Sequence, residues 1–164
     1  LHHMDDPMAG WRVLADLLKA GGLMKIGLYS ELARRHILKT RGEIELQGIG
    51  TSEFEIRQFR RSLAASHNEN HESLTKWPDF FSLSELRDLI FHVQEHRFTL
   101  PKIHKSLNEL GLKFCGFENA DVVGQFKRSF GNRSDACDLS QWHQFEEENP
   151  RTFAGMYQFW CQKI

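Results

Sequence analysis

The chain has 164 residues, of which 40% are hydrophobic and 26% charged, and these proportions are typical of a globular protein with one core. Its net charge of −1 and its short apolar runs predict neither a nucleic-acid partner nor a membrane partner. The three cysteines are an odd number without C-x-x-C spacing, which argues against a disulfide framework and predicts a cytoplasmic location.

Hydrophobic periodicity in the first half of the chain predicts helices around one buried strand. The predicted elements are a helix at 6–22, a strand at 23–30, helices at 31–45 and 48–66, and a polar surface loop at 67–78. Ser30 is expected to cap the helix that follows it, and Thr51 or Ser52 the next one. A helix that runs through a Gly turn into an apolar strand is typical of an α/β protein.

The second half continues the mixed pattern. Its predicted elements are helices at 80–92 and 99–111, a strand at 112–118, short helices at 120–131 and 138–149, and a strand at 157–163. Thr99 is the expected cap of the helix that Gly111 ends. Three strands are too few for a closed α/β sheet, so we expect an incomplete one.

Aromatic side chains are abundant, and their most common role is to fill a core. The residues we expect to pack the core are Phe80, Phe81, Phe91, Phe98, Phe114, Phe117, Phe126, Phe130, Trp142, Phe145, Tyr157, Phe159 and Trp160. Cys115 and Cys161 fall in predicted strands and are expected to be buried thiols. The acidic run at 146–149 is expected to be a solvated helix end.

The first thirty residues, "LHHMDDPMAGWRVLADLLKAGGLMKIGLYS", resemble the middle of a class I S-adenosylmethionine (SAM)-dependent methyltransferase. In that family a similar "LHH" motif ends the fourth strand and "LKPGG" precedes the fifth, with Ala20 here in place of the Pro. Two histidines before Met4 also match an affinity-tag remnant, but Leu1 and the "DDP" that follows match the family. Residues 80–118 and 149–163 resemble the carboxyl half of a bacterial subgroup that often carries tetratricopeptide repeats.

The resemblance implies an incomplete doubly wound, Rossmann-like methyltransferase sheet made of carboxyl-terminal strands with inserted helices. Residues 1–164 would form a single partial domain, with helical cover at 31–76 and 120–149. No G-x-G turn occurs after a strand, so the SAM-binding half is expected upstream. The implied partners are that missing amino-terminal half, possible tetratricopeptide repeats and an unidentified methyl acceptor, either a small molecule or a protein.

Ligands of open α/β sheets bind at the carboxyl ends of the strands, which selects the candidate site residues. His2 and His3 follow the fourth strand in the resemblance and are candidates for SAM binding and for catalysis as bases. His92 is a third candidate base. The residues expected to bind the acceptor are Tyr29, Ser30, Arg34, Glu95, His96 and Arg97.

Two alternatives remain open. The run "HVQEH" at 92–96 matches the H-x-x-E-H pattern of inverted zinc peptidases, with Glu146 or Glu147 as a third ligand. That pattern needs one helix, and the helix is expected to end near His92. The missing Gly-rich turn instead favours a non-catalytic interaction module. The methyltransferase reading itself contains no metal site.

Overall fold

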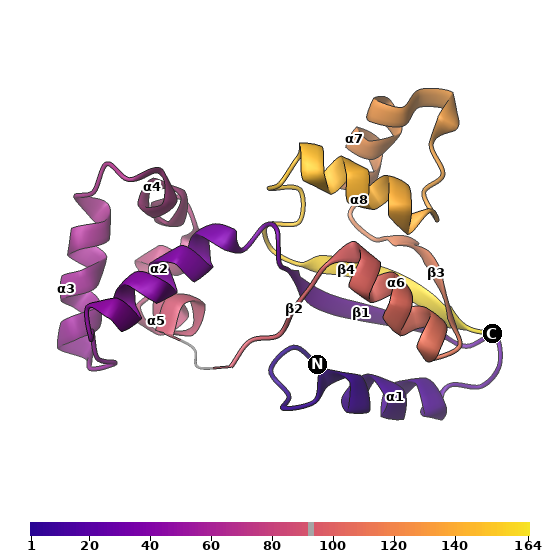
Figure 1. The fold of residues 1–164 in the computed structure, drawn as a ribbon, viewed down its shortest axis with the longest axis horizontal. Helices are drawn as coiled ribbons and strands as arrows, with labels where there is room; N and C mark the ends of the chain where they lie inside the picture. Colours follow the sequence, from indigo (N-terminus) through magenta and orange to yellow (C-terminus); the bar gives the residue numbers. More distant parts are fainter. Residues whose placement is uncertain (92–93) are drawn as a thin grey trace. The chain divides into compact units, whose positions relative to one another are not determined.

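In the computed structural model, which describes residues 1–91 and 94–164, the chain forms two compact units (Figure 1). The sheet unit comprises Leu1–Ala33 and Gln94–Ile164, and the helical unit comprises Arg34–Val93. The helical unit therefore extends beyond residue 76, where the predicted helical cover ended, and residues 120–149 pack within the sheet unit. Among the described residues, no helix has the length and apolar character that crossing a bilayer requires.

A mixed four-stranded sheet is the centre of the sheet unit. Its strands are β1 (Leu23–Ser30), β2 (Arg97–Phe98), β3 (Leu112–Phe117) and β4 (Tyr157–Lys163), in the order β2-β1-β4-β3. β1 pairs in parallel with β2, and β4 lies antiparallel to both β1 and β3. The α/β class and the three longer strands are confirmed, whereas β2 has no counterpart in the sequence prediction.

Neighbouring residues of each strand point to opposite faces of the sheet, and only one face is fully covered. On β4, Tyr157, Phe159 and Cys161 are buried, while the intervening Gln158 and Trp160 are exposed. Burial raises the pKa of the Cys161 thiol to about 12, which keeps it protonated. β1 follows the same alternation, so its successive side chains belong to two different environments.

Four helices belong to the sheet unit (Figure 1). They are α1 (Pro7–Leu17), α6 (Leu100–Glu109), α7 (Ala120–Phe130) and α8 (Leu139–Glu148), with a short 3₁₀ turn at Gly131–Arg133. Their first turns are capped by the side chains of Asp6, Thr99, Asn119 and Asp138, each of which accepts backbone N–H hydrogen bonds. The Thr99 cap confirms the sequence prediction.

Aromatic packing fills the space between these helices and the sheet. The Trp142 indole stacks on Phe126 with a centroid separation of 3.9 Å and meets Phe117 edge-on at 4.8 Å. The predicted aromatic core is therefore largely confirmed, but Trp160 is 40% exposed because it points to the open face of the sheet. Cys115, predicted to be buried, is exposed because it shares the outer face of β3 with Lys113, while Leu112 and Phe114 face the core.

The helical unit has its own hydrophobic core. Its elements are α2 (Arg35–Leu46), α3 (Glu53–Ala64), α4 (Glu69–Thr75), a 3₁₀ turn (Pro78–Phe81) and α5 (Leu83–Phe91). The buried side chains are Ile37, Ile44, Ile56, Phe59, Leu63, Leu74, Phe80, Leu86, Leu89 and Ile90. Ser52, one of the two predicted caps, caps α3, and Glu55 completes a reciprocal capping box that the sequence analysis did not predict.

Three local predictions for this region are wrong. Ser30 does not cap α2, because that helix begins at Arg35; the Ser30 hydroxyl instead accepts a hydrogen bond from the Ala33 N–H. The polar stretch at 67–78 contains α4, which the Asn68 side chain caps. Phe81 is 73% exposed although its neighbour Phe80 is buried, because successive side chains of the 3₁₀ turn point in directions about 120° apart.

Candidate functional site

Two segments that are far apart in the sequence lie side by side in the sheet unit. The backbone N–H of His96 donates to the carbonyl of His2 at 2.8 Å, and the His3 ring contacts the Gln94 carbonyl at 3.2 Å. The Gln94 amide in turn donates to Asp5 at 2.8 Å. Residues 1–5 are thereby held against residues 94–97, next to the carboxyl end of β1.

Three aromatic side chains gather at that end of β1. The ring centroid of His2 lies 4.2 Å from that of Tyr29 and 4.4 Å from that of His3. The His3 and Tyr29 centroids are 6.0 Å apart. Tyr29 lies between the buried Leu28 and Ser30, so it points to the opposite, less covered face of the sheet. The predicted residues His2, His3 and Tyr29 are therefore brought together at a strand end.

The hydrogen bond that His2 makes fixes which ring nitrogen carries its proton. Nδ1 lies 3.3 Å from the Gly27 carbonyl oxygen, which only accepts, so the neutral ring has its proton on Nδ1 and a basic lone pair on Nε2. Burial lowers the pKa of His2 below its ordinary 6.5; the nearby His3 lowers it further, while Glu95 opposes the shift. His2 is therefore neutral and able to accept a proton at physiological pH.

We expect two neighbouring substitutions to move the His2 pKa in opposite directions. His3→Gln should raise it, because a positive charge that disfavours protonated His2 is removed. Glu95→Gln should lower it, because an attractive negative charge is lost. NMR titration of the His2 ring resonances measures both shifts, and an unchanged midpoint in both variants would contradict the proposed electrostatics.

The lowered pKa of His2 also makes the folding stability depend on pH. The unfolded chain binds the His2 proton more tightly than the folded chain does. The contribution of His2 to the free energy of unfolding is therefore fully present above pH 6.5, and it is lost as the pH falls through the pKa of His2 in the folded chain.

Glu95, His96 and Arg97 line the same region. The Glu95 side chain is only 2% exposed and lies 3.8 Å from the Arg97 guanidinium, which is a long ion pair. Two buried nitrogens, Nε2 of His96 and Nε of Arg97, have no hydrogen-bond partner within the described structure. Buried polar atoms are normally satisfied, so these two are available to a bound molecule.

Ser30, predicted to bind the acceptor, lies on the other face of β1 in a fully buried polar network. Its hydroxyl donates to Glu146 at 2.6 Å, and the Tyr157 hydroxyl donates to both oxygens of the same carboxylate at 2.7 and 2.8 Å. Burial, and then the Glu146 charge, raises the pKa of Tyr157 well above its ordinary value, so this hydroxyl keeps its proton. Ser30 is thus directed toward the core and away from Tyr29.

Glu146 was predicted to be solvated, and this prediction is wrong because the side chain is 1% exposed. A signal for its burial exists in the sequence. Leu139, Trp142 and Glu146 follow one another at helical spacings of three and four residues, which places the carboxylate on the apolar stripe of α8. Glu147 and Glu148 leave that stripe and are exposed.

Arg34, another predicted site residue, is buried and belongs to the helical unit. His92 lies outside the described residues. The described part of the zinc pattern does not lie on a helix, because residues 94–96, which include Glu95 and His96, are not helical.

No protein-family model matches the chain. An uncharacterized protein of the cyanobacterium Synechococcus sp. is 28% identical over 160 residues, in an alignment that covers 88% of this chain and 37% of that protein. The chain therefore spans little more than a third of the length of the relative that it matches.

Proposed function

We propose that this chain is the acceptor-side part of a SAM-dependent methyltransferase that acts in the cytoplasm. The observation that carries the proposal is that His2, His3 and Tyr29 meet at the carboxyl end of β1. The neutral His2 ring has its proton on Nδ1, which leaves a lone pair on Nε2. Strand ends of this kind are where open α/β sheets bind ligands.

The direction of the strands supports the proposal. β1 runs parallel to β2, and β1 and β3 run in the same direction because both are antiparallel to β4. Many doubly wound sheets contain one antiparallel strand, usually at an edge, whereas β4 lies between β1 and β3. A sheet that was antiparallel throughout would have argued against a methyltransferase.

The chain's own residues would position the acceptor and remove its proton. SAM supplies an activated methyl group, so the protein mainly has to orient the two reactants. Nε2 of His2 would accept the proton of an O–H or N–H acceptor, which would make the acceptor's lone pair available to the activated methyl group. His96 Nε2 and Arg97 Nε offer hydrogen bonds that orient the acceptor.

The site fits the acceptor better than it fits SAM. The rings of His2, His3 and Tyr29 provide flat surfaces, but none of the described strands is followed by a Gly-rich turn that would let the backbone approach SAM. We therefore assign SAM binding mainly to sequence outside this chain, with His2 and His3 at the edge of that site.

The experiment uses the complete polypeptide that contains this segment. SAM binding is measured by calorimetry, and methyl-labelled SAM is incubated with a pool of cellular metabolites and proteins to measure label transfer. We expect His2→Gln to preserve SAM affinity within about threefold and to lower label transfer by about 100-fold, the loss typical of a missing general base. The basic side of the pH–rate profile should be unaffected, whereas the acidic limb that reports His2 should disappear.

His104→Gln is the matched control, since it changes an exposed histidine of α6 in the same unit. Failure of the complete polypeptide to bind SAM would overturn the proposal. Normal SAM binding with undiminished transfer by His2→Gln would overturn only the role of His2.

An interaction module is the second candidate, and one surface favours it. α1 exposes three apolar side chains, Val13, Leu14 and Leu17, the last of them 77% exposed, and Leu23 at the start of β1 is also exposed. Exposed apolar clusters of this kind often mark contacts with other protein segments. A polypeptide that binds a protein partner through α1 but binds no SAM would favour this candidate.

A further inference from the structure

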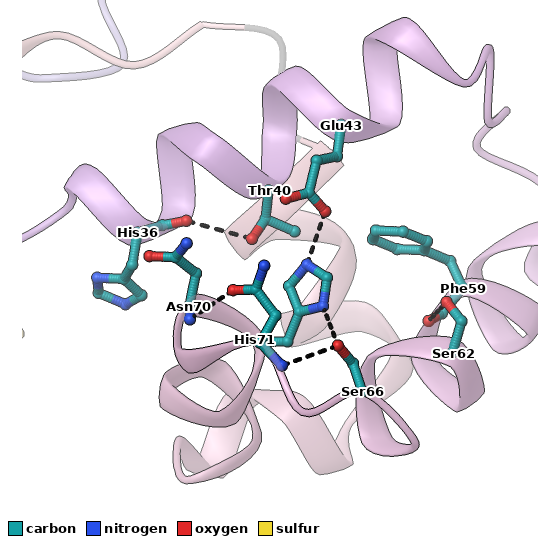
Figure 2. Close-up of polar contacts among 9 residues, drawn as sticks. His36, Thr40, Glu43, Phe59, Ser62, Ser66, Asn70 and His71 are labelled. Atoms are coloured by element: carbon teal, nitrogen blue, oxygen red, sulfur yellow. Dashed lines mark hydrogen bonds and ion pairs between the residues drawn. The ribbon is translucent and has the colours of Figure 1, made fainter.

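Three polar side chains form a continuous hydrogen-bonded chain in the helical unit (Figure 2). Ser66 follows α3, His71 lies in α4 and Glu43 lies in α2. The Ser66 hydroxyl is 2.8 Å from His71 Nδ1, and Glu43 Oε2 is 2.6 Å from His71 Nε2. Figure 2 shows the imidazole ring standing between the hydroxyl and the carboxylate.

The chemistry of the two partners fixes the protons in this chain. A carboxylate only accepts, so the neutral His71 ring has its proton on Nε2 and donates it to Glu43. Nδ1 then carries the lone pair and accepts the hydroxyl proton of Ser66. The Asn68 N–H donates to the Ser66 oxygen at 3.2 Å, which fixes its position.

We propose that Ser66 is a nucleophile activated by His71, with Glu43 orienting the ring and stabilising its charged form, and that it cleaves small uncharged esters. Hydroxyl, imidazole and carboxylate have the same roles as in the serine hydrolase triad, which is recognised by geometry and roles and not by sequence position. The two ring nitrogens have the opposite roles from those in that template. Here Nδ1 faces the hydroxyl and Nε2 faces the carboxylate, whereas in the template Nε2 faces the hydroxyl.

The reaction balances without any group beyond water. Ser66 Oγ bonds to the ester carbonyl carbon as its proton passes to His71 Nδ1. The ester C–O bond breaks, and the leaving alcohol takes that proton. Water then attacks the acyl carbon and gives a proton to His71, which returns it to Ser66 as the C–Oγ bond breaks. The products are one carboxylic acid and one alcohol.

A surface pocket in the same unit supplies room for the acyl group. Its volume is about 370 Å³, and its lining includes Phe59 and Ser62 of α3. Phe59 and Ser62 share one face of α3, and Ser66 follows two residues after that helix ends. Figure 2 shows the Phe59 ring pointing toward His71. Glu55 also lines the pocket, so its charge favours an uncharged substrate over an anionic one.

Access to the nucleophile is compatible with the reaction. Ser66 is half-buried, and the side chains of His71 and Glu43 are 14% and 32% exposed. The hydroxyl is therefore partly shielded from bulk water while an ester of modest size can still reach it.

The experiment measures hydrolysis of p-nitrophenyl acetate and covalent labelling by a fluorophosphonate, followed by peptide mass spectrometry. We expect the label on Ser66, and we expect Ser66→Ala to lower hydrolysis above the solution rate by about 100-fold. Glu43→Gln should lower it by about tenfold and shift the pH profile. Ser129→Ala is the matched control, because Ser129 is an exposed serine of α7 whose hydroxyl donates to the Gln125 carbonyl of its own helix, away from the proposed site.

Mapping of the label on the unaltered protein needs no variant and so does not depend on how well the variants fold. A label on other residues, or equal hydrolysis by the Ser66→Ala and Ser129→Ala variants, would overturn the proposal. Glu43 and His71 variants that lose stability while the hydrolysis rate stays unchanged would show that this chain of contacts only joins the helices.

Discussion

Replacing Glu146 with alanine should lower the free energy of unfolding of the sheet unit by roughly 3 kcal/mol, because the change leaves two buried hydroxyls without an acceptor. Ser30 and Tyr157 are both fully buried, and both donate to this carboxylate. Neither hydroxyl can turn to water without opening the core. Chemical denaturation followed by near-ultraviolet circular dichroism measures the loss.

Two further variants test the same network. Glu147→Ala is the matched control, because Glu147 is 64% exposed and its contact with His143 is a long one of 3.8 Å, so its loss should change stability by less than about 0.5 kcal/mol. Glu146→Gln retains an acceptor oxygen and should cost less than alanine. Equal stability of the Glu146→Ala and Glu147→Ala variants would show that the network contributes nothing to folding.

Replacing Trp142 with alanine should cost about 4 kcal/mol, the range measured for large aromatic residues removed from cores. Its side chain is fully buried, stacks on Phe126, and donates from Nε1 to the Ala136 carbonyl at 3.0 Å. Removing the ring therefore creates a cavity and also releases the loop before α8. Thermal and urea denaturation should show the sheet unit losing most of its cooperativity.

Trp160 provides the comparison for this prediction. It is also a tryptophan of the sheet unit, but it points to the open face of β4. Trp160→Ala should cost about 2 kcal/mol, roughly half of the Trp142 loss, because the Trp160 residue is already 40% exposed and its removal leaves no enclosed cavity. Similar losses for the two variants would mean that aromatic packing between α7 and α8 is not what stabilises this unit.

Elements with strong local signals were predictable from the sequence. The strand at 23–30 is confirmed to the residue because an apolar run is bounded there by Gly22 and Ser30. The helix caps Ser52 and Thr99 are confirmed because a hydroxyl side chain precedes an apolar stripe at each position. These features depend on a few neighbouring residues, so periodicity and capping are sufficient to find them.

Elements that depend on distant partners were not predictable. α4 consists mainly of polar residues, so its local composition does not predict a helix. The helix buries Leu74 in the core of the helical unit. β2 has only two residues and exists because Tyr29 and Ser30 provide a neighbouring strand. Contacts between residues that are far apart in the sequence determine both elements.

The candidate site was predictable in part for the same reason. The position of Tyr29 at a strand end follows from the local pattern, and its contact with His2 was expected only through the family resemblance. The alternation of β1 directs Ser30 to the core. Predicting that direction requires knowing which face of the sheet is covered. The Ser66, His71 and Glu43 chain joins three helical segments that no local pattern links.

The division of the chain into two units determines the order in which it can fold during synthesis. The helical unit is one continuous stretch, so all of its contacts can form as soon as α5 leaves the ribosome. β1 is made earlier, but its main partner β4 is made long afterwards, and closing so long a loop is slow. Nascent chains stalled after α5 should therefore contain a folded helical unit beside an unpaired β1, which chaperones would have to protect from aggregation.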